Sequence, residues 1–512
     1  MSAQFNIRRA SSRMVSVLQR ELDLPRFVAA TLVGRGIDTP KAARAFLFPS
    51  FKHDWLDPYL IPGLGDVVDA LEDAVRKGRR ILVFGDFDLD GISATTVLTR
   101  GLRELGADTV PFIPKRFEEG YGITAAALER VKTYGPEFSR DGRLRYRLQG
   151  RGEARAGGWG STSQSPTTTS PRTWFPEGVP VADPKIDSTC PSCVLAGAGV
   201  ALKLVQALGA RFGKPYLWRD FVDFATLGTV ADLMPMLGEN RPLVIEGIKM
   251  MNKAPRPCIA ALLETSGAVG KPLTSTNLSF SLIPRLNAAG RMGNADLALN
   301  LLMSDDFDEA YRLATELEGL NDQRREIEAE LSEIAKVQAA EIYHGQRALV
   351  VAGEGWHEGV KGIVASRLVG IYGVPCILLT IDGDEARGSG RSVGRVNLFA
   401  AVESASDLLV RFGGHEAAVG ITLKTKDIPA FTKALCDYLD KLPEDDFHPL
   451  IEIDTCINLD ELTLETVGAL KQVAPFGQEN PTPCFLARDV LLTHCRAVGA
   501  EKNHFSCTLT NG

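Results

Sequence analysis

Residues 81 to 91 narrow the possible folds more than any other segment. An apolar run, Ile81 to Phe84, is followed by aspartate at every second position and then by a glycine. A short apolar run of this kind is typical of a buried strand in a parallel sheet. Asp86, Asp88 and Asp90 would repel one another, and the repulsion would raise their pKa values unless a bound cation offset it. Because hard divalent ions prefer oxygen ligands, the segment predicts a metal site at the end of a strand.

Two other interpretations of this segment remain open. An EF-hand calcium loop also begins with Asp-x-Asp-x-Asp-Gly, but it needs a bidentate Glu at its twelfth position, where this chain has Val97. That loop also follows a helix, whereas Ile81 to Phe84 has the pattern of a strand. A solvated acidic turn is the second alternative, although α/β folds place their ligands at the carboxyl ends of strands.

The composition predicts a soluble protein of several domains. With 512 residues the chain is too long for one core, and we expect three or four domains. Apolar residues make up 45% and charged residues 24%, which is ordinary for a globular protein. No signal peptide and no membrane-spanning apolar run is recognisable, so we expect a cytoplasmic protein with no membrane partner. The net charge of -7 excludes a uniformly basic surface but not a local groove for nucleic acid.

The cysteines give little functional information. Nine are scattered along the chain, and only Cys190 and Cys193 are close together. One Cys-x-x-Cys pair is weak evidence for zinc, and disulfides are not expected in a reducing compartment. We interpret the cysteines as structural, because a free cysteine usually behaves as a small buried hydrophobe.

The order of apolar patterns predicts an α/β fold in two halves. Residues 5 to 75 have the pattern of helices and turns, and from Arg80 strands alternate with helices, which predicts a parallel sheet covered by helices. Residues 306 to 342 predict one long polar helix that connects the halves. A strand-rich segment follows from Ile451 and stops directly after an apparent strand, so we expect a truncated final domain. The predicted strands include Ile81–Phe84, Thr109–Ile113 and Ala348–Ala352, and the predicted helices include Ile92–Leu105, Thr124–Thr133 and Gly197–Leu208. Ala348–Ala352 opens a second α/β segment that continues through Val374–Ile381 and ends near Leu442.

Two further segments carry residue types that suit phosphate binding. Lys115, Arg116 and Tyr121 follow the second predicted strand, where cations could hold phosphate and the aromatic ring could stack on a base or a sugar. Pro284 to Arg291 combines Arg285, Asn287 and Arg291 with small residues, which suits contact with a phosphate backbone. An exposed charged loop and a solvated turn with two arginines are the alternatives.

A lone acid and three glycine-rich segments complete the candidates. Asp232 ends an apolar run within Phe221 to Asp232, which we expect to carry a second acidic strand end or loop, although a lone Asp is more often a helix cap. The segments 353–359, 388–392 and 413–415 are expected to be glycine-rich turns, and they carry Gly390, Arg391, Gly414 and His415. Such turns could cradle a nucleic-acid backbone, although any one of them is more often an ordinary tight turn.

Together these segments resemble the RecJ family of single-strand-specific DNA exonucleases, in the DHH phosphoesterase superfamily. The resemblance implies an N-terminal helical region (1–75), a parallel-sheet DHH domain (76–305), a connecting helix (306–345), an α/β DHH-associated domain (346–445) and a partial OB-fold domain (446–512), an incomplete β-barrel that binds single strands. The matching segments, in chain order, are Gly85–Gly91, Pro114–Gly122, Leu195–Lys203, Gly228–Asp232, Pro284–Arg291, Gly353–Arg367, Gly413–Gly420 and Pro475–Gly477.

The resemblance also implies an activity and the residues that serve it. It implies 5′-to-3′ hydrolysis of single-stranded DNA in repair and recombination, with two Mn²⁺ or Mg²⁺ ions that activate water and stabilise the leaving oxygen. Single-stranded DNA is the implied partner, and a single-strand-binding protein or a helicase is a further candidate. The metal set is Asp86, Asp88, Asp90 and Asp232, with Asp88 and Asp90 as catalytic candidates, and the substrate set is Arg116, Tyr121, Arg285, Asn287, Arg291, Gly390, Arg391, Gly414 and His415.

One part of the family pattern is absent. The family carries a Thr-Val-Asp strand end and an Asp-His-His triplet in the stretch that lies between Gly122 and Leu195 here, and this chain has neither. Its seven histidines include none between His53 and His344, and residues 139 to 175 contain seven arginines in a Gly/Ser/Thr-rich run without a strand pattern. Because several metal ligands are missing, we expect a polypeptide of this sequence to be inactive or nearly so.

The genetic code offers a hypothesis for this departure. Shifted by one base, the codons for Asp141 to Arg147 can encode Thr-Val-Asp-Cys-Gly-Ile, and shifted by two, those for Ser165 to Ser170 can encode Thr-Asp-His-His-Glu. Small insertions or deletions, in the gene or in its sequencing, would explain both. An unbroken reading frame in resequenced DNA, with shifted codons that do not encode these motifs, would reject the hypothesis. The alternative function is a non-catalytic protein that binds single strands or serves as a replisome scaffold.

Overall fold

The first sheet forms where the sequence predicts it. The structure is a computed structural model that describes residues 4–120, 122–134, 180–499 and 502–511. β2 (Ile81–Phe84) pairs in parallel with β3 (Thr109–Phe112), and α5 (Leu89–Glu104) follows β2 and packs on both strands. α6 (Ala125–Lys132) follows β3. The predicted α/β fold with parallel strands is therefore confirmed.

Helices pack around α5 to form the largest apolar core. α5 lies against α7 (Gly197–Arg211) and α8 (Val222–Ala231), and α8 also lies against α9 (Asn240–Lys253). The burial of apolar surface between these helices is the main force that holds them together. The same core extends through α4 (Leu64–Arg76), α10 (Pro257–Thr265), α12 (Ile283–Arg291) and α13 (Ala295–Met303).

The expectation of an acidic strand end or loop over residues 221 to 232 is wrong. This segment forms the helix α8, and Asp232 is the residue that caps its carboxyl end. Every residue from Val222 to Val230 is buried. A helix that is buried on all sides lacks the 3.6-residue periodicity of an amphipathic helix, so its pattern resembles that of a buried strand.

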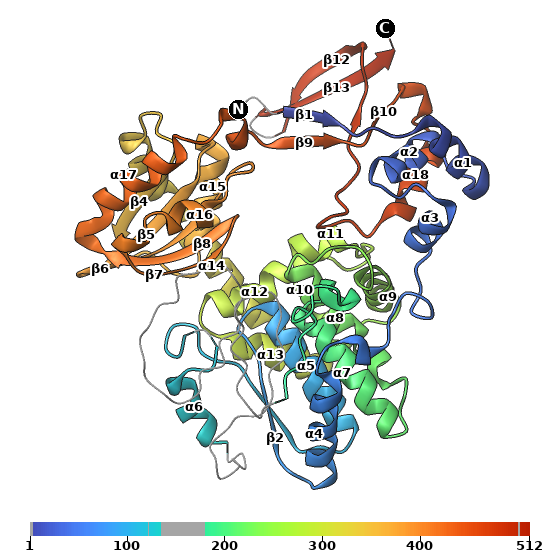
Figure 1. Cartoon of the computed structure of the whole chain (residues 1–512), viewed down its shortest axis with the longest axis vertical. Coiled ribbons are helices and arrows are strands. Elements are labelled where there is room, and N and C mark those ends of the chain that lie inside the picture. Colours follow the sequence, from blue (N-terminus) through green and yellow to red (C-terminus); the bar gives the residue numbers. More distant parts are fainter. Residues whose placement is uncertain (1–3, 121, 135–179, 500–501, 512) are drawn as a thin grey trace.

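The predicted connecting helix is confirmed as α14 (Phe307–Ile342), the long helix that leads from the first half to the second (Figure 1). The second half contains one five-stranded sheet in the order β4-β5-β6-β8-β7, in which only β4 and β5 are parallel. Helices α15, α16 and α17 pack on this sheet. The bounds are β4 (Leu349–Glu354), α15 (Lys361–Tyr372), β5 (Cys376–Asp382), β6 (Glu385–Arg391), α16 (Leu398–Glu403), β7 (Leu409–His415), β8 (Ala418–Lys424) and α17 (Ile428–Leu439).

Two of the expected glycine-rich turns are strands. Residues 388 to 391 lie inside β6, and residues 413 to 415 form the end of β7. A Cβ atom at Gly390 would lie 2.7 Å from Cγ2 of Val419 on the neighbouring strand β8. At this position glycine allows close packing within the sheet, and it does not form a turn.

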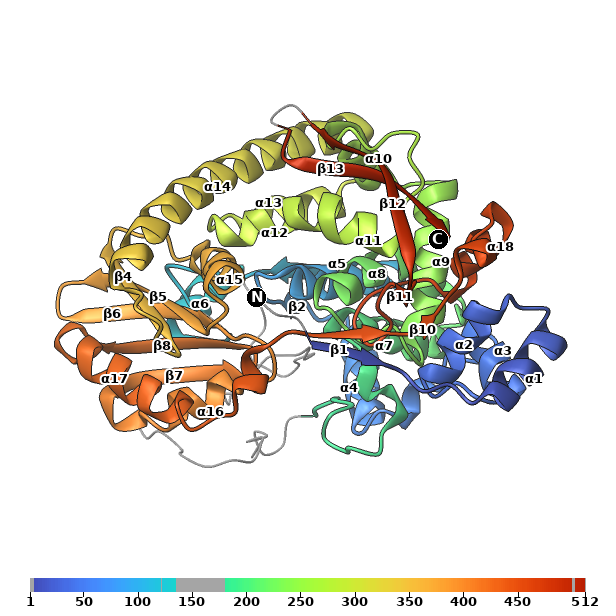
Figure 2. The same ribbon diagram turned by 90° about the horizontal axis from the view of Figure 1, so that it is seen from above.

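The N-terminal region packs against the beginning of the last segment of the chain. β1 (Gln4–Ile7), which the sequence pattern does not predict, pairs in parallel with β9 (Leu450–Ile453), as Figure 2 shows from above. The ring of Phe27 lies 5.4 Å from that of Phe485, and the Arg35 guanidinium is paired with the buried Asp454 carboxylate at 2.7 Å. The helices of this N-terminal region are α1 (Ser12–Leu22), α2 (Arg26–Gly34) and α3 (Pro40–Leu47).

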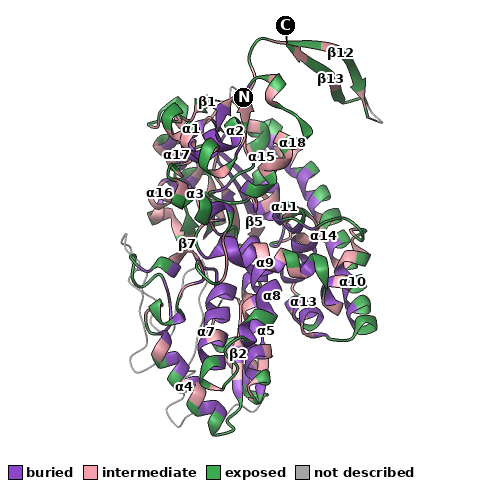
Figure 3. Ribbon diagram, turned by 90° about the vertical axis from the view of Figure 1, so that its right-hand side faces the viewer, coloured by how far each residue is buried: buried purple, intermediate pink, exposed green. Residues whose placement is uncertain are grey.

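The last segment is rich in strands, as predicted. β10 (Thr455–Cys456) pairs with β11 (Phe485–Leu486), α18 (Leu464–Ala469) lies between them in sequence, and β12 (Val490–Val498) pairs with β13 (His504–Asn511) in an antiparallel hairpin. This hairpin is largely exposed (Figure 3), and the described strands form no closed barrel. No helix within the described ranges has the length and apolar character needed to cross a membrane.

A buried ion pair fixes the start of α9 to three other segments. The side chains of Lys203 and Glu239 are almost fully buried and are paired with each other. Glu239 also accepts hydrogen bonds from the amide of Leu56 at 2.8 Å and the hydroxyl of Ser192 at 2.6 Å. Burial lowers the pKa of Lys203 to about 8, although the neighbouring Glu239 acts in the opposite direction. The carboxylate is therefore the group that makes a charged lysine tolerable here.

We expect Glu239→Ala to destabilise the fold strongly. The substitution leaves the buried Lys203 ammonium without its carboxylate, which costs about 3–5 kcal/mol. Chemical denaturation of the full chain measures the change in unfolding free energy. Glu246→Ala on α9 is the matched control, because Glu246 is partly exposed and its ion-pair partner is the exposed Lys249, so it should change stability by about 1 kcal/mol or less. Equal effects of the two substitutions would contradict this account.

α12 packs closely on the loop that follows β2. A Cβ atom at Gly290 would lie 2.1 Å from the carbonyl oxygen of Phe87, so Gly290→Ala should destabilise the protein by about 1–3 kcal/mol. Gly319 on α14 is exposed, and a Cβ atom there would meet no other segment within 4 Å, so Gly319→Ala should instead stabilise by about 0.5–1 kcal/mol. Denaturation curves of both variants check the opposite signs, and a Gly290→Ala protein as stable as the wild type would reject the close contact.

Candidate functional site

The three aspartates lie on a tight loop between β2 and α5. Asp88 is the N-cap of α5, and its Oδ1 accepts the amide hydrogen of Gly91 at 2.8 Å. Asp86 Oδ1 accepts the amide hydrogen of Phe87 at 2.7 Å. A Cβ atom at Gly91 would lie 2.6 Å from the backbone of Asp86, so the glycine is needed for this close turn. The sequence thus places the carboxylates at the carboxyl end of a parallel strand, as predicted.

Asp90 is the most buried of the three. Its oxygens accept the amide hydrogens of Gly197 and Ala198, at 2.8 and 2.9 Å, in the first turn of α7. The pKa of Asp90 is raised to about 7, mainly by burial and also by the charges of Asp88 and Asp232, while the two amides oppose the shift. The structure therefore brings Asp88, Asp90 and Asp232 close enough to affect one another's charge.

These carboxylates alone do not make a complete metal centre. In the parts of the chain that the structure describes, no group of three or more His, Cys, Asp or Glu side chains is placed to hold a metal ion. Both oxygens of Asp90 are engaged by the amides of α7. The four-aspartate metal set consequently stays a prediction, and the described residues do not by themselves fit a two-metal site.

Arg116 lies beside the aspartate loop. Its guanidinium is 4.9 Å from the centre of the Phe87 ring, and the charges of Asp86, Asp88 and Glu358 act on it. Burial lowers the pKa of Arg116, and these three carboxylates oppose that shift. Glu358 belongs to the second half of the chain, so Arg116 lies where the two halves meet. Tyr121, the predicted stacking residue of the same loop, lies outside the described residues.

α12 joins the aspartate loop to the second half. Asn287 Oδ1 accepts the amide hydrogen of Leu89 at 3.2 Å, and Arg291 donates to the carbonyl oxygen of Gly359 at 3.2 Å. A Cβ atom at Gly359 would lie 2.2 Å from the carbonyl oxygen of Arg291. The side chain of Asn287 thus contacts the aspartate loop, and that of Arg291 contacts the turn before α15.

Four arginines converge at this junction. The pKa of Arg291 is lowered to about 10, mainly by burial and also by the positive charges of Arg116, Arg324 and Arg391, while Glu328 acts in the opposite direction. Arg391 is held within β6 by hydrogen bonds to Ser389 Oγ at 3.0 Å and to the carbonyl oxygen of Gly390 at 2.8 Å. We call Arg116, Arg291, Arg324 and Arg391 the arginine cluster.

Three other predicted substrate residues have different surroundings. Arg285 is paired with Glu318 of α14 and donates to the carbonyl oxygen of Ser281 at 2.8 Å, so its position serves helix packing. Gly414 and His415 end β7, where His415 Nδ1 accepts the amide hydrogen of Ala417 at 3.2 Å. Their role in substrate binding stays a prediction.

Two residues at the junction were not predicted from the sequence. Arg324 lies on α14, where it is one more charge on a polar helix, and its proximity to Arg291 depends on the tertiary fold. The ring of His357 lies 5.5 Å from that of Phe117, which joins the two halves. The glycine-rich pattern around His357 was the only sequence signal for this contact.

Comparisons with known proteins agree with the fold and the order of these segments. A family model described as the DHHA1 domain matches residues 345–441, and one described as the RecJ OB domain matches residues 453–512. A crystal structure of RecJ in complex with Mn²⁺ from Thermus thermophilus superposes with a TM-score of 0.80 at 28% identity, covering 99% of this chain and 72% of that one. A Mg²⁺ complex from the same organism superposes with a TM-score of 0.77.

Two relatives with assigned names extend this similarity to sequence. The chain is 35% identical to the single-stranded-DNA-specific exonuclease RecJ of Bacillus subtilis over 99% of its own length, and it spans 64% of that relative. It is 32% identical to the protein of the same name from Salmonella typhimurium, with 86% of this chain and 80% of the relative covered. From this identity over most of both chains, we conclude that the chain belongs to the RecJ family.

Proposed function

We propose that this protein is a single-stranded-DNA exonuclease that works in the 5′-to-3′ direction. The observation that carries the proposal is the arginine cluster beside the aspartate loop, at the junction of the two halves. The names of the relatives support the same substrate class, and they do not favour the alternative of a non-catalytic scaffold.

The charges at the junction support a phosphate ligand. Arg116, Arg291 and Arg391 come from three separate segments, and burial lowers the pKa of each. Bringing buried cations together is unfavourable unless an anion offsets their repulsion, and a guanidinium matches the geometry of a phosphate group. A DNA strand supplies one phosphate per nucleotide, so this cluster would fix the position of the strand next to the aspartates.

Hydrolysis, in contrast to binding, would depend on metal ligands that this sequence lacks. Mn²⁺ or Mg²⁺, when bound in a complete family site, would supply the activated water for hydrolysis. Among the described residues the carboxylates do not complete such a site, and the sequence has no histidine between His53 and His344. We therefore propose that a polypeptide of this sequence binds single strands but turns them over slowly or not at all. Its proposed compartment is the cytoplasm, and a single-strand-binding protein or a helicase is its proposed partner.

We expect that restoring the reading frame restores hydrolysis. One version would carry the sequence as written, and a second would replace residues 139–175 by the amino acids of the shifted frames. With Mn²⁺, the second version should release nucleotides from 5′-labelled single strands and later from 3′-labelled ones, whereas the first should bind DNA without release. Binding by both versions and release by neither would reject the exonuclease. Equal release by both would reject the view that ligands are missing.

Arg391→Gln should weaken the binding of single-stranded DNA by about tenfold, because it removes one charge-assisted contact to phosphate. The slope of log affinity against log salt should fall by about 0.7, the value for one phosphate of a single strand. Fluorescence anisotropy over a salt series measures both quantities. Arg387→Gln is the matched control on β6, since the Arg387 side chain is 63% exposed and its ion-pair partner is Glu385 of the same strand. A similar loss in both variants would contradict a specific phosphate contact.

A further inference from the structure

The turn that carries Arg116 is closed by a single carboxylate. The amide of Lys115 donates to Glu119 Oε2 at 2.8 Å, and the carbonyl oxygen of Lys115 accepts the amide hydrogen of Glu119 at 2.8 Å. Residues 115 to 119 are thereby tied together at both ends. Glu119 is buried, in contrast to its neighbour Glu118. Three residues lie between these ends, Arg116, Phe117 and the exposed Glu118, and the first two form the tip that faces other segments.

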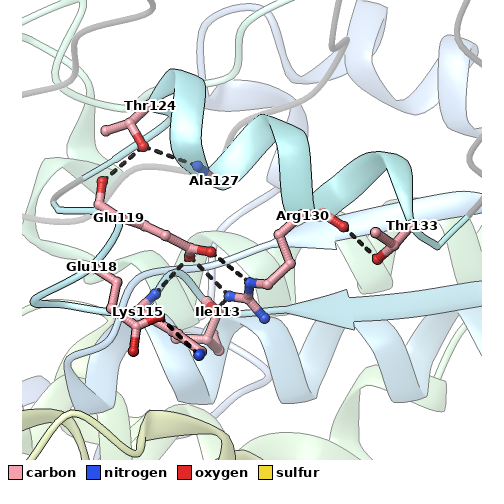
Figure 4. A network of polar contacts seen from close by, with 8 residues as sticks. All are labelled: Ile113, Lys115, Glu118, Glu119, Thr124, Ala127, Arg130 and Thr133. Carbon is pink, nitrogen blue, oxygen red and sulfur yellow. Dashed lines mark hydrogen bonds and ion pairs between the residues drawn. The ribbon is translucent and has the colours of Figure 1, made fainter.

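Arg130 of α6 fixes this carboxylate to the sheet. Its guanidinium binds both oxygens of Glu119, at 2.6 and 3.0 Å, and also donates to the carbonyl oxygen of Ile113, next to the end of β3. Figure 4 shows these side chains facing one another between the turn and α6. The Arg130 guanidinium also lies 4.0 Å from the centre of the Phe112 ring. A two-pronged pair of this kind restricts orientation more than a single hydrogen bond does.

The tip of the turn contacts three other segments. Arg116 lies over the Phe87 ring of the aspartate loop. The Phe117 ring packs against His357 of the second half, and it would be 3.0 Å from a Cβ atom at Gly293, directly after α12. A displacement of the turn would therefore move Arg116 relative to both the aspartates and the rest of the arginine cluster.

We propose that Glu119 and Arg130 are positioning residues that hold Arg116 in place for a phosphate of the single strand. Neither side chain faces the arginine cluster, because the partners of both lie in the turn, at the end of β3 and on α6. Their effect on DNA passes through Arg116, and the inference thus rests on the phosphate contact proposed above. Without the pair, Arg116 keeps its charge but loses its fixed direction.

A double-mutant cycle tests this role in the full chain. Arg116→Gln should weaken binding of single-stranded DNA by about tenfold and lower the salt slope by about 0.7. Glu119→Gln should weaken binding by about fivefold and lower the salt slope, because a glutamine amide cannot accept two hydrogen bonds from Arg130 in the bidentate geometry. This loss is expected even though the substitution removes a negative charge. In the Arg116→Gln background, Glu119→Gln should change the affinity by less than about twofold, because the group through which it acts is gone.

Glu118→Gln is the matched control, since Glu118 is the exposed neighbour that pairs with the ammonium of Lys115 at 2.9 Å. It should leave the affinity unchanged or raise it slightly. Arg130→Lys provides a second variant, in case Glu119→Gln fails to fold, because lysine retains the positive charge but cannot form the two-pronged pair. It should show the same loss of affinity and the same dependence on Arg116.

The possible results separate this inference from the proposed function. Wild-type protein that does not bind single strands, or an Arg116→Gln variant that binds as the wild type does, would overturn the phosphate contact and this inference with it. A loss in Arg116→Gln together with independent, multiplying losses in Glu119→Gln and Arg130→Lys would overturn the positioning role alone. A lower unfolding temperature with an unchanged salt slope would assign the pair to fold stability and would likewise overturn the role.

Discussion

The site depends on places where two backbones approach too closely for a side chain. Gly290 on α12 faces the carbonyl oxygen of Phe87 in the aspartate loop, and Gly359 faces the carbonyl oxygen of Arg291. The two contacts involve consecutive residues of α12, Gly290 and Arg291, so α12 joins the aspartate loop to the second half of the chain. Because packed interiors do not deform continuously, this packing fixes the distance between the carboxylates and the second half within narrow limits.

This packing brings several arginines together, and the fold provides carboxylate partners for only some of them among the described residues. Arg324 and Arg367 both bind the buried carboxylate of Glu328, and Glu358 acts on Arg116. The structure gives no comparable ion pair for Arg391 within the described residues, whose side-chain hydrogen bonds go to Ser389 and Gly390. This difference supports the proposed ligand with negative charge at Arg391, because the arginines on α14 and α15 already have a carboxylate partner.

Local patterns predicted the elements well, and they failed where the tertiary fold decides the outcome. The strand before the aspartates and the long polar helix could be recognised because each has a clear period. The sequence of α8 suggests a strand end or a loop, because a helix buried on all sides shows no 3.6-residue period. The glycines of β6 suggest a turn, since the sequence alone does not show that a neighbouring strand leaves no room for a Cβ atom.

The candidate site divides in the same manner. Asp88, Asp90 and Arg116 could be placed together from the sequence, because they follow adjacent parallel strands. Arg324 could not be, since a charge on a polar helix gives no sign of the partner across the fold. Arg285 was assigned to the substrate for its residue type, but the structure gives it a carboxylate partner on α14. Residue type alone does not distinguish an arginine that binds a ligand from one that joins two helices.

The residues proposed to bind DNA and the expected metal ligands that are missing belong to different segments of the chain. The arginine cluster and the pair that positions Arg116 all lie outside residues 135–179, in segments whose packing the structure describes. The expected missing metal ligands would all belong inside that stretch or next to it. A frame change there would remove the water-activating groups and leave the phosphate contacts in place. Such a chain would still recognise a single strand, because recognition by phosphate contact needs only charge and direction.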